Sequence, residues 1–186
     1  MSAVQTPAPA SIRSTWAIDP THSSVEFAVR HLMISTVKGR FTAVDGTVVL
    51  DEANPAASTA EITVQVASID TRESQRDAHL RSADFFEVEK YPTLTFRSTG
   101  VRDVTADGFK LLGDLTIHGV TRETTLDVVH EGRVKDPWGG DRAGYSATTR
   151  IKRSDFGLTW NQVLEAGGFA VGDEVKISLD IELVKK

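Results

Sequence analysis

The chain has 186 residues, of which 40% are hydrophobic and 25% are charged, and its formal net charge at pH 7 is −5. This length is enough for one domain with a sizeable core, and the composition excludes a chain that is disordered or membrane-embedded as a whole. The acidic balance argues against a nucleic-acid partner, which would need a basic face, and the absence of cysteine excludes disulfides, zinc–thiolate sites and a cysteine nucleophile.

The first fifteen residues are small, polar and proline-bearing, without hydrophobic periodicity. We predict a flexible tail over residues 1–15 and a single domain over residues 16–186. The tail lacks the basic start and the apolar stretch of about 7–15 residues that a secretory signal needs. Since no segment approaches the ~20 apolar residues of a spanning helix either, the sequence predicts a cytoplasmic protein.

From residue 16 onward, short runs alternate between apolar and polar residues, which is the period of half-buried strands. One short helix is expected over residues 74–82, where Asp70 or Thr71 could cap its start. Leu80 and Ala83 could pack against the barrel or across its mouth. The second strand is expected to bend at Gly46. Strands are predicted over residues 22–30, 39–50, 61–66, 93–98, 109–117, 124–129, 142–151 and 175–183.

Eight antiparallel strands can close into a barrel, and closure removes the exposed edges of a sheet. The sequence therefore predicts an all-β fold, an eight-stranded antiparallel β-barrel with one short helix inserted between strands 3 and 4.

The sequence contains no recognisable catalytic or metal-binding motif. No two of the five histidines have the i,i+4 spacing of a helical metal pair, and Asp77 and His79 are two residues apart on the predicted helix, so they do not share a face. No serine lies in a Gly-x-Ser-x-Gly elbow, and Gly167-Gly168 lacks the lysine of a phosphate loop. We predict no metal, no cofactor and no catalytic residue, so the chain is not expected to be an enzyme.

Large apolar residues lie on the predicted inner face of the strands. An eight-stranded barrel can either fill itself with side chains or hold one small ligand, and periodicity does not distinguish the two. The candidate ligand-binding residues of an apolar cavity are Phe27, Val29, Leu94, Phe96, Leu111, Leu115, Ile117, Leu126, Val128, Tyr145, Leu179 and Ile181.

Five short motifs occur in order along nearly the whole chain from Trp16. They are Trp16-x-Ile18-Asp19-x-x-His22-Ser23-x-Val25-x-Phe27, then Val37-x-Gly39-x-Phe41, then Arg76-Asp77-x-His79-Leu80-x-Ser82-x-Asp84-Phe85-Phe86 with Tyr91-Pro92-x-Leu94-x-Phe96, then Gly113-Asp114-Leu115-Thr116-Ile117-His118-Gly119-Val120-Thr121, and finally Asp155-Phe156-Gly157-Leu158. Together they resemble the YceI-like family, bacterial lipocalin-like proteins described as polyisoprenoid-binding. The lipocalin Gly-x-Trp signature is absent near the first strand, so the likeness to lipocalins is one of shape.

The resemblance implies a hollow lipocalin-like barrel that binds, carries or stores a long-chain polyisoprenoid lipid or an isoprenoid quinone, and it implies a homodimer. Many members of the family are exported. A phosphate or quinone headgroup should stay near the barrel mouth, where His22, Arg76, His79 and Arg81 are candidate donors. Two alternatives stay open: a non-catalytic structural or stress-response module with a filled barrel, and an enzyme of isoprenoid metabolism that uses a histidine site.

Overall fold

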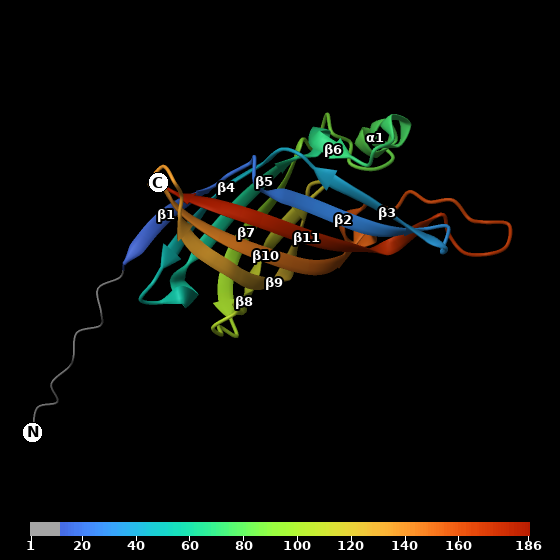
Figure 1. Cartoon of the computed structure of the whole chain (residues 1–186). Coiled ribbons are helices and arrows are strands. Elements are labelled where there is room, and N and C mark those ends of the chain that lie inside the picture. Colours follow the sequence, from blue (N-terminus) through green and yellow to red (C-terminus); the bar gives the residue numbers. More distant parts are fainter. Residues whose placement is uncertain (1–11) are drawn as a thin grey trace, which may run out of the picture.

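A computed structural model describes residues 12–186 and shows one long, twisted β-barrel with a short helix at one end (Figure 1). The first strand, β1, begins at Arg13, inside the segment assigned above to a tail. Residues 1–11 of that predicted tail lie outside the described residues. The barrel domain therefore starts three residues earlier than the predicted boundary at Trp16.

The described chain contains eleven strands, one α-helix and three short 3-10 helices. The strands are β1 (Arg13–Ile18), β2 (Ser24–His31), β3 (Ser35–Phe41), β4 (Val44–Asp51), β5 (Thr59–Gln65), β6 (Ile69–Asp70), β7 (Thr93–Arg102), β8 (Gly108–Ile117), β9 (Val120–Lys135), β10 (Asp141–Lys152) and β11 (Val171–Lys185). The helices are η1 (Pro55–Ala57), η2 (Val66–Ser68), α1 (Ser74–Arg81) and η3 (Arg153–Phe156).

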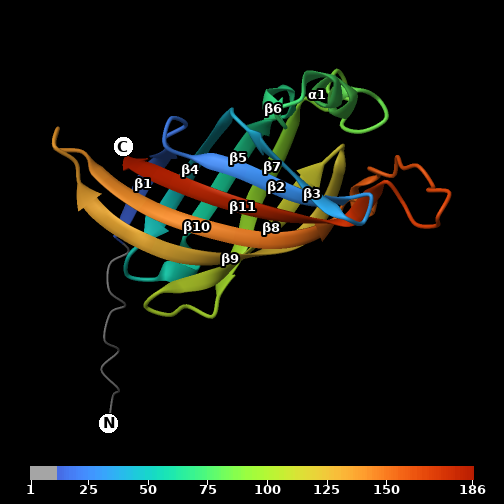
Figure 2. The ribbon, with the colours of Figure 1, turned by 45° about the vertical axis from the view of Figure 1, so that its right-hand side comes forward.

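The barrel closes because β1 pairs with both β4 and β11. All strand pairs are antiparallel, and β2 continues the line of β1 along β11: β1 pairs with the end of β11, whereas β2 pairs with its first two thirds. In the same way β3 continues into β4, and β5 into β6 (Figure 2). When each interrupted pair is counted as one barrel strand, the eleven strands form eight, which confirms the predicted eight-stranded antiparallel barrel.

The interruption between β3 and β4 has a physical cause, a change in which residues face inward. Phe41 and Val44 are both buried although they are three positions apart, which regular alternation does not allow. The chain accommodates them with a break at residues 42 and 43. The break thus falls there rather than at the predicted bend, Gly46, which lies inside β4.

Helix α1 lies within the predicted range and packs beside β6. Its N-cap is Glu73, whose carboxylate accepts hydrogen bonds from the backbone N–H groups of Gln75 and Arg76, so neither Asp70 nor Thr71 caps the helix as predicted. Thr71 instead donates its backbone N–H and its hydroxyl to Asp77. None of the helices in residues 12–186 is long and apolar enough to span a bilayer.

Candidate functional site

The barrel interior contains two cavities that meet. Cavity 1 has a volume of about 160 Å³ and cavity 2 a volume of about 370 Å³. Ile62, Leu126 and Leu179 line both cavities, so these three side chains form the waist between them. Together the cavities fall in the size range of small-molecule sites, roughly 300–1,000 Å³. The interior of this barrel is therefore hollow rather than filled.

Each of the twelve residues predicted to face an apolar cavity lines one of these two. Alternation along a strand sends every second side chain inward, and the strands are long enough for this rule to hold. Cavity 1 is lined by Phe27, Val29, Leu94, Phe96, Leu115 and Ile117; cavity 2 by Leu111, Val128, Tyr145 and Ile181; and both by Leu126 and Leu179. Their contact with a ligand stays a prediction.

Part of the wall of cavity 1 comes from α1 and the residues that follow it. Leu80 of α1 and the following residues Phe85 and Phe86 line it, and the ring of Phe86 meets that of Phe41 edge to face, with centroids 6.0 Å apart. The predicted packing of Leu80 against the barrel thus agrees with the structure. These side chains therefore come from the connection between β6 and β7 rather than from the strands of the barrel.

Two glycines leave room for aromatic rings on the wall of cavity 1. A Cβ on Gly39 would lie 2.4 Å from Cζ of Phe27, and a Cβ on Gly113 would lie 2.3 Å from Cζ of Phe96. Both distances are far below van der Waals contact. The glycines therefore let the two rings lie against neighbouring strands instead of projecting across the cavity.

The four predicted headgroup donors lie outside both cavities and are held by other partners. Arg76 donates to the hydroxyl and carbonyl oxygens of Thr71, each at 2.8 Å. Arg81 donates to the backbone carbonyls of residues 67 and 69 at 3.0 and 2.9 Å, so both arginines anchor the helical segment. The Nε2 atom of His79 lies 2.8 Å from Asp84, and its ring packs against Trp160.

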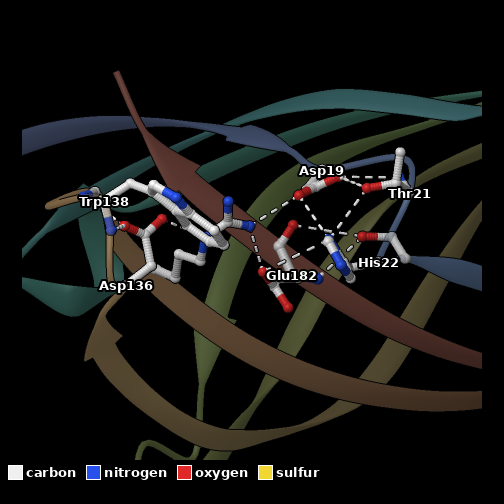
Figure 3. Close-up of polar contacts among 9 residues, drawn as sticks. Asp19, Thr21, His22, Asp136, Trp138 and Glu182 are labelled. Carbon is white, nitrogen blue, oxygen red and sulfur yellow. Dashed lines mark hydrogen bonds and ion pairs between the residues drawn. The ribbon is translucent and has the colours of Figure 1, made fainter.

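The fourth predicted donor, His22, belongs to a polar cluster on the outer wall of the barrel (Figure 3). Its Nδ1 lies 2.9 Å from Oδ2 of Asp19 and 4.0 Å from Oε1 of Glu182. Arg142 donates from Nη1 to the same two carboxylates, at 2.8 and 2.5 Å, and from Nε to Asp136 at 2.8 Å. Three carboxylates thus surround one guanidinium, which leaves the cluster with excess negative charge.

Hydrogen bonds and neighbouring charges both perturb the ionisation of the cluster. Hydrogen bonds from Thr21, His22 and Arg142 hold the pKa of Asp19 well below its usual range. The hydrogen bond to Asp19, together with the negative charges of Asp19 and Glu182, raises the pKa of His22 above its usual value. The cluster therefore favours a charged imidazole at a pH where a free histidine has begun to lose its proton.

The cluster also contains three residues whose ligand atoms lie close enough together to hold a metal ion. One ligand atom each from Asp19, His22 and Glu182 lies within 4.8 Å of the others, and imidazole and carboxylate are common zinc ligands. The sequence analysis did not bring these residues together, because Glu182 is 160 positions from His22. Arg142 already donates to both carboxylates, so the arrangement is neutralised in part without an ion.

Arg153 is a buried cation that the sequence analysis missed. It lines cavity 1 and is only 7% exposed. Its guanidinium donates to the backbone carbonyls of Gly172 at 2.8 Å, Leu158 at 2.6 Å, Trp160 at 3.0 Å and Val171 at 3.3 Å. Burial lowers its pKa below the usual value for arginine. Arg153 thereby joins η3 to the loop before β11 and to the first residues of β11.

Polar groups at the interior are concentrated in cavity 2. Arg133 of β9 lines it and donates from Nη1 to Oε1 of Glu52 at 2.8 Å, with its guanidinium 5.5 Å from the ring centroid of Trp16. Burial lowers the pKa of Arg133, but hydrogen bonds with Glu52 and Tyr145 outweigh it and raise that pKa above its usual value. Cavity 2 thus combines an apolar wall with a few paired polar groups.

A closed antiparallel barrel with internal apolar cavities places the protein in the lipocalin-like class. The model of the YceI-like domain matches residues 16–183, so the chain belongs to the YceI-like family. A UPF0312 protein of Vibrio cholerae is 42% identical over 165 residues, which cover 89% of this chain and 83% of that protein.

Solved structures share the fold. Burkholderia cenocepacia BcnA superimposes with a TM-score of 0.78 at 24% identity, covering 89% of this chain and 98% of that one. A polyisoprenoid binding domain from Saccharophagus degradans, implicated in plant cell wall breakdown, superimposes with a TM-score of 0.68 at 17% identity, covering 92% and 98%. At these identities the likeness is one of fold.

Proposed function

We propose that this protein binds a long-chain polyisoprenoid lipid, such as an isoprenoid quinone, inside the barrel and carries or stores it. The observation that carries the proposal is the pair of adjoining cavities with apolar walls. The Saccharophagus degradans domain with the same fold is described as polyisoprenoid-binding, which agrees with such a ligand. A homodimer and a cytoplasmic location stay predictions of the sequence.

The energetics of an apolar tail favour binding in such a space. Burial of apolar surface contributes roughly 25 cal/mol per Å², so a tail that buries about 400 Å² would gain on the order of 10 kcal/mol. Association and ordering cost about 4 kcal/mol or more of this gain. A net free energy of about 6 kcal/mol corresponds to a Kd of roughly 40 μM.

The two alternatives have less support from the geometry. A filled barrel does not agree with the two cavities. An enzyme with a histidine site would need His22 or His79 to face a bound substrate, whereas both lie outside the cavities with Asp19 and Asp84 as partners. We therefore propose a binding role without catalysis.

The test is to extract the purified protein with organic solvent, identify bound lipids by mass spectrometry, and titrate the stripped protein with geranylgeraniol. Leu126→Phe should fill the waist and weaken binding at least tenfold. Val129→Phe makes the same kind of change on the same strand, but at a side chain that is 46% exposed on the outer face, and it should bind like the wild type. An empty barrel that also fails to bind the added isoprenoid would contradict the proposal.

A further inference from the structure

One end of the barrel carries an exposed apolar surface built from two segments. They are the turn between β2 and β3 and the loop that joins η3 to β11, which extend side by side in both views (Figure 1, Figure 2). Within residues 12–186 ten large apolar side chains are exposed, and five of them lie here. These five, which we call the apolar tip, are Leu32, Met33, Ile34, Val163 and Phe169, with exposed fractions from 37% to 80%.

The two segments of the apolar tip form one surface. The backbone N–H of Leu32 donates to the carbonyl oxygen of Ala170 at 2.8 Å, which joins the turn to the loop. Within the loop, Val163 and Phe169 form an isolated antiparallel bridge, and residues paired in this way point to the same face. A contiguous exposed apolar patch of this kind marks an interaction site, whereas single exposed apolar residues do not.

The turn between β2 and β3 presents apolar residues where the backbone disfavours them. Leu32 and Met33 have φ values of 49° and 61°, and the backbone N–H of Ile34 donates to the carbonyl oxygen of His31 at 3.1 Å. A hairpin turn with positive φ at both central residues strongly prefers Asn and Gly. Neither the turn geometry nor packing in the core explains two apolar side chains here, which points to a partner outside the chain.

The outer wall beside the apolar tip is basic, although the chain as a whole has a net charge of −5. Arg30 donates from Nη2 to a backbone carbonyl of the turn at 2.8 Å, so its charge lies at the tip itself. Ala28 pairs with Lys38 on one side and with Lys176 on the other, which places the two lysines on one face. None of the three cations forms an ion pair within residues 12–186. Against them stands one acidic residue of the loop, Glu165.

The apolar tip also continues the wall of cavity 1. Val29 and Val171 line this cavity. Val29 lies two residues before the end of β2, and Val171, the first residue of β11, pairs with His31 at that end. A partner that covers the tip would therefore lie next to this end of the barrel interior.

We propose that the apolar tip docks the protein on an anionic lipid bilayer, with Arg30, Lys38 and Lys176 at the lipid phosphates. Apolar side chains of interfacial segments enter a bilayer by roughly 5–10 Å, and basic residues beside them are attracted by the negative surface. A second copy of the chain fits less well, because a two-fold contact through the tip brings the same cations together. This inference goes beyond the proposed function, since docking does not require a ligand in the barrel.

The absence of cysteine from the chain allows a single fluorescent label at the tip. Met33→Cys in the full-length protein, labelled with an environment-sensitive fluorophore, should show a blue shift with phosphatidylcholine vesicles that contain phosphatidylglycerol. Val134→Cys is the matched control, because these side chains are 58% and 64% exposed and lie near opposite ends of β11. No shift at residue 33, or an equal shift at both positions, would overturn docking through the tip.

Two paired substitutions test the apolar contribution. Met33→Ser with Ile34→Ser should lower partition into these vesicles about tenfold, whereas Val134→Ser with Trp138→Ser should leave it unchanged. Unchanged geranylgeraniol affinity in the first variant would separate docking from the proposed function. Light scattering tests the other occupant: a wild-type dimer that becomes monomeric in this variant would assign the tip to a second copy and overturn the inference.

A charge substitution tests the choice of an anionic surface. Lys38→Gln with Lys176→Gln should remove most of the preference for vesicles with phosphatidylglycerol over pure phosphatidylcholine. Lys135→Gln with Lys186→Gln makes the same change in net charge near the other end of the barrel and should keep the preference. An equal loss in both variants, or no preference in the wild type, would overturn the assignment of an anionic bilayer to the tip.

Discussion

Cavity 1 and cavity 2 share a waist but differ in how they are built. Cavity 1 is covered by α1 and the two phenylalanines that follow it, and its surface is almost entirely apolar. Cavity 2 is covered by the β4–β5 connection and contains paired charges and hydroxyl groups. Burial in cavity 1 stabilises a hydrocarbon tail, whereas a polar headgroup needs hydrogen-bonding partners, which are concentrated in cavity 2. The difference favours a bound lipid whose tail lies in cavity 1 and whose headgroup lies in cavity 2.

The largest loss of stability should follow removal of Arg153, which lines cavity 1. Arg153→Ala removes four hydrogen bonds to buried or half-buried carbonyls and is expected to lower the free energy of unfolding by about 3 kcal/mol. Chemical denaturation measures the loss. Arg150→Ala removes an exposed ion pair with Glu174 and should hardly change the midpoint; similar losses in both variants would contradict the supporting role of Arg153.

A smaller loss of stability should follow a change in the wall of cavity 1. Gly113→Ala would place a Cβ 2.3 Å from Phe96 and 2.6 Å from the carbonyl oxygen of Arg97, and such overpacking costs about 1–3 kcal/mol. Gly100→Ala is the control on the paired strand, since its Cβ would meet nothing within 4 Å. Thermal unfolding should separate the two variants; indistinguishable midpoints would show that the ring of Phe96 moves freely.

Filling each cavity in turn tests the direction of the ligand. Ile177→Phe reduces cavity 1 and should weaken binding of long isoprenoid alcohols about tenfold, roughly 1.4 kcal/mol, with less effect on short ones. Val128→Phe reduces cavity 2 and should weaken binding of both lengths alike if the headgroup lies there, because the two ligands have the same headgroup. Calorimetry measures the affinity of each variant for a long and a short isoprenoid alcohol. A length-dependent loss in Val128→Phe and a length-independent loss in Ile177→Phe would reverse the proposed direction of the ligand.

The smallest effect concerns the cluster outside the barrel. The pKa of His22 is raised in the folded state, so its contribution to stability is complete below a pH of about 6.5 and is lost as the pH rises through the folded-state pKa. NMR titration should find this pKa above that of a free histidine, and Asp19→Asn should lower it. Ligand affinity should not change in this variant, and a tenfold loss would place the cluster in the binding site.

Alternation was enough to predict the side chains that line the cavities. Phe27 and Leu179 lie on regular strands, where every second residue faces inward, so their positions followed from local pattern. Alternation failed where the set of residues that face inward changes along the chain. This happens between Phe41 and Val44, which are three positions apart although both side chains are buried. It also missed β1, whose short run follows the proline-bearing segment and is stabilised by pairing with two distant strands.

The polar groups depended on contacts between distant parts of the chain. His22 and Glu182 are 160 residues apart, and Arg133 and Glu52 are 81 apart. A local sequence pattern contains no information about such partners. The partners of a charged side chain decide whether it is free to bind a ligand. The sequence by itself determined the eight barrel strands, the helix and the apolar lining of the interior, because strand period and turn residues are local properties. Only the tertiary structure decided that the interior is hollow, that it narrows at a waist, and that its cations are already paired.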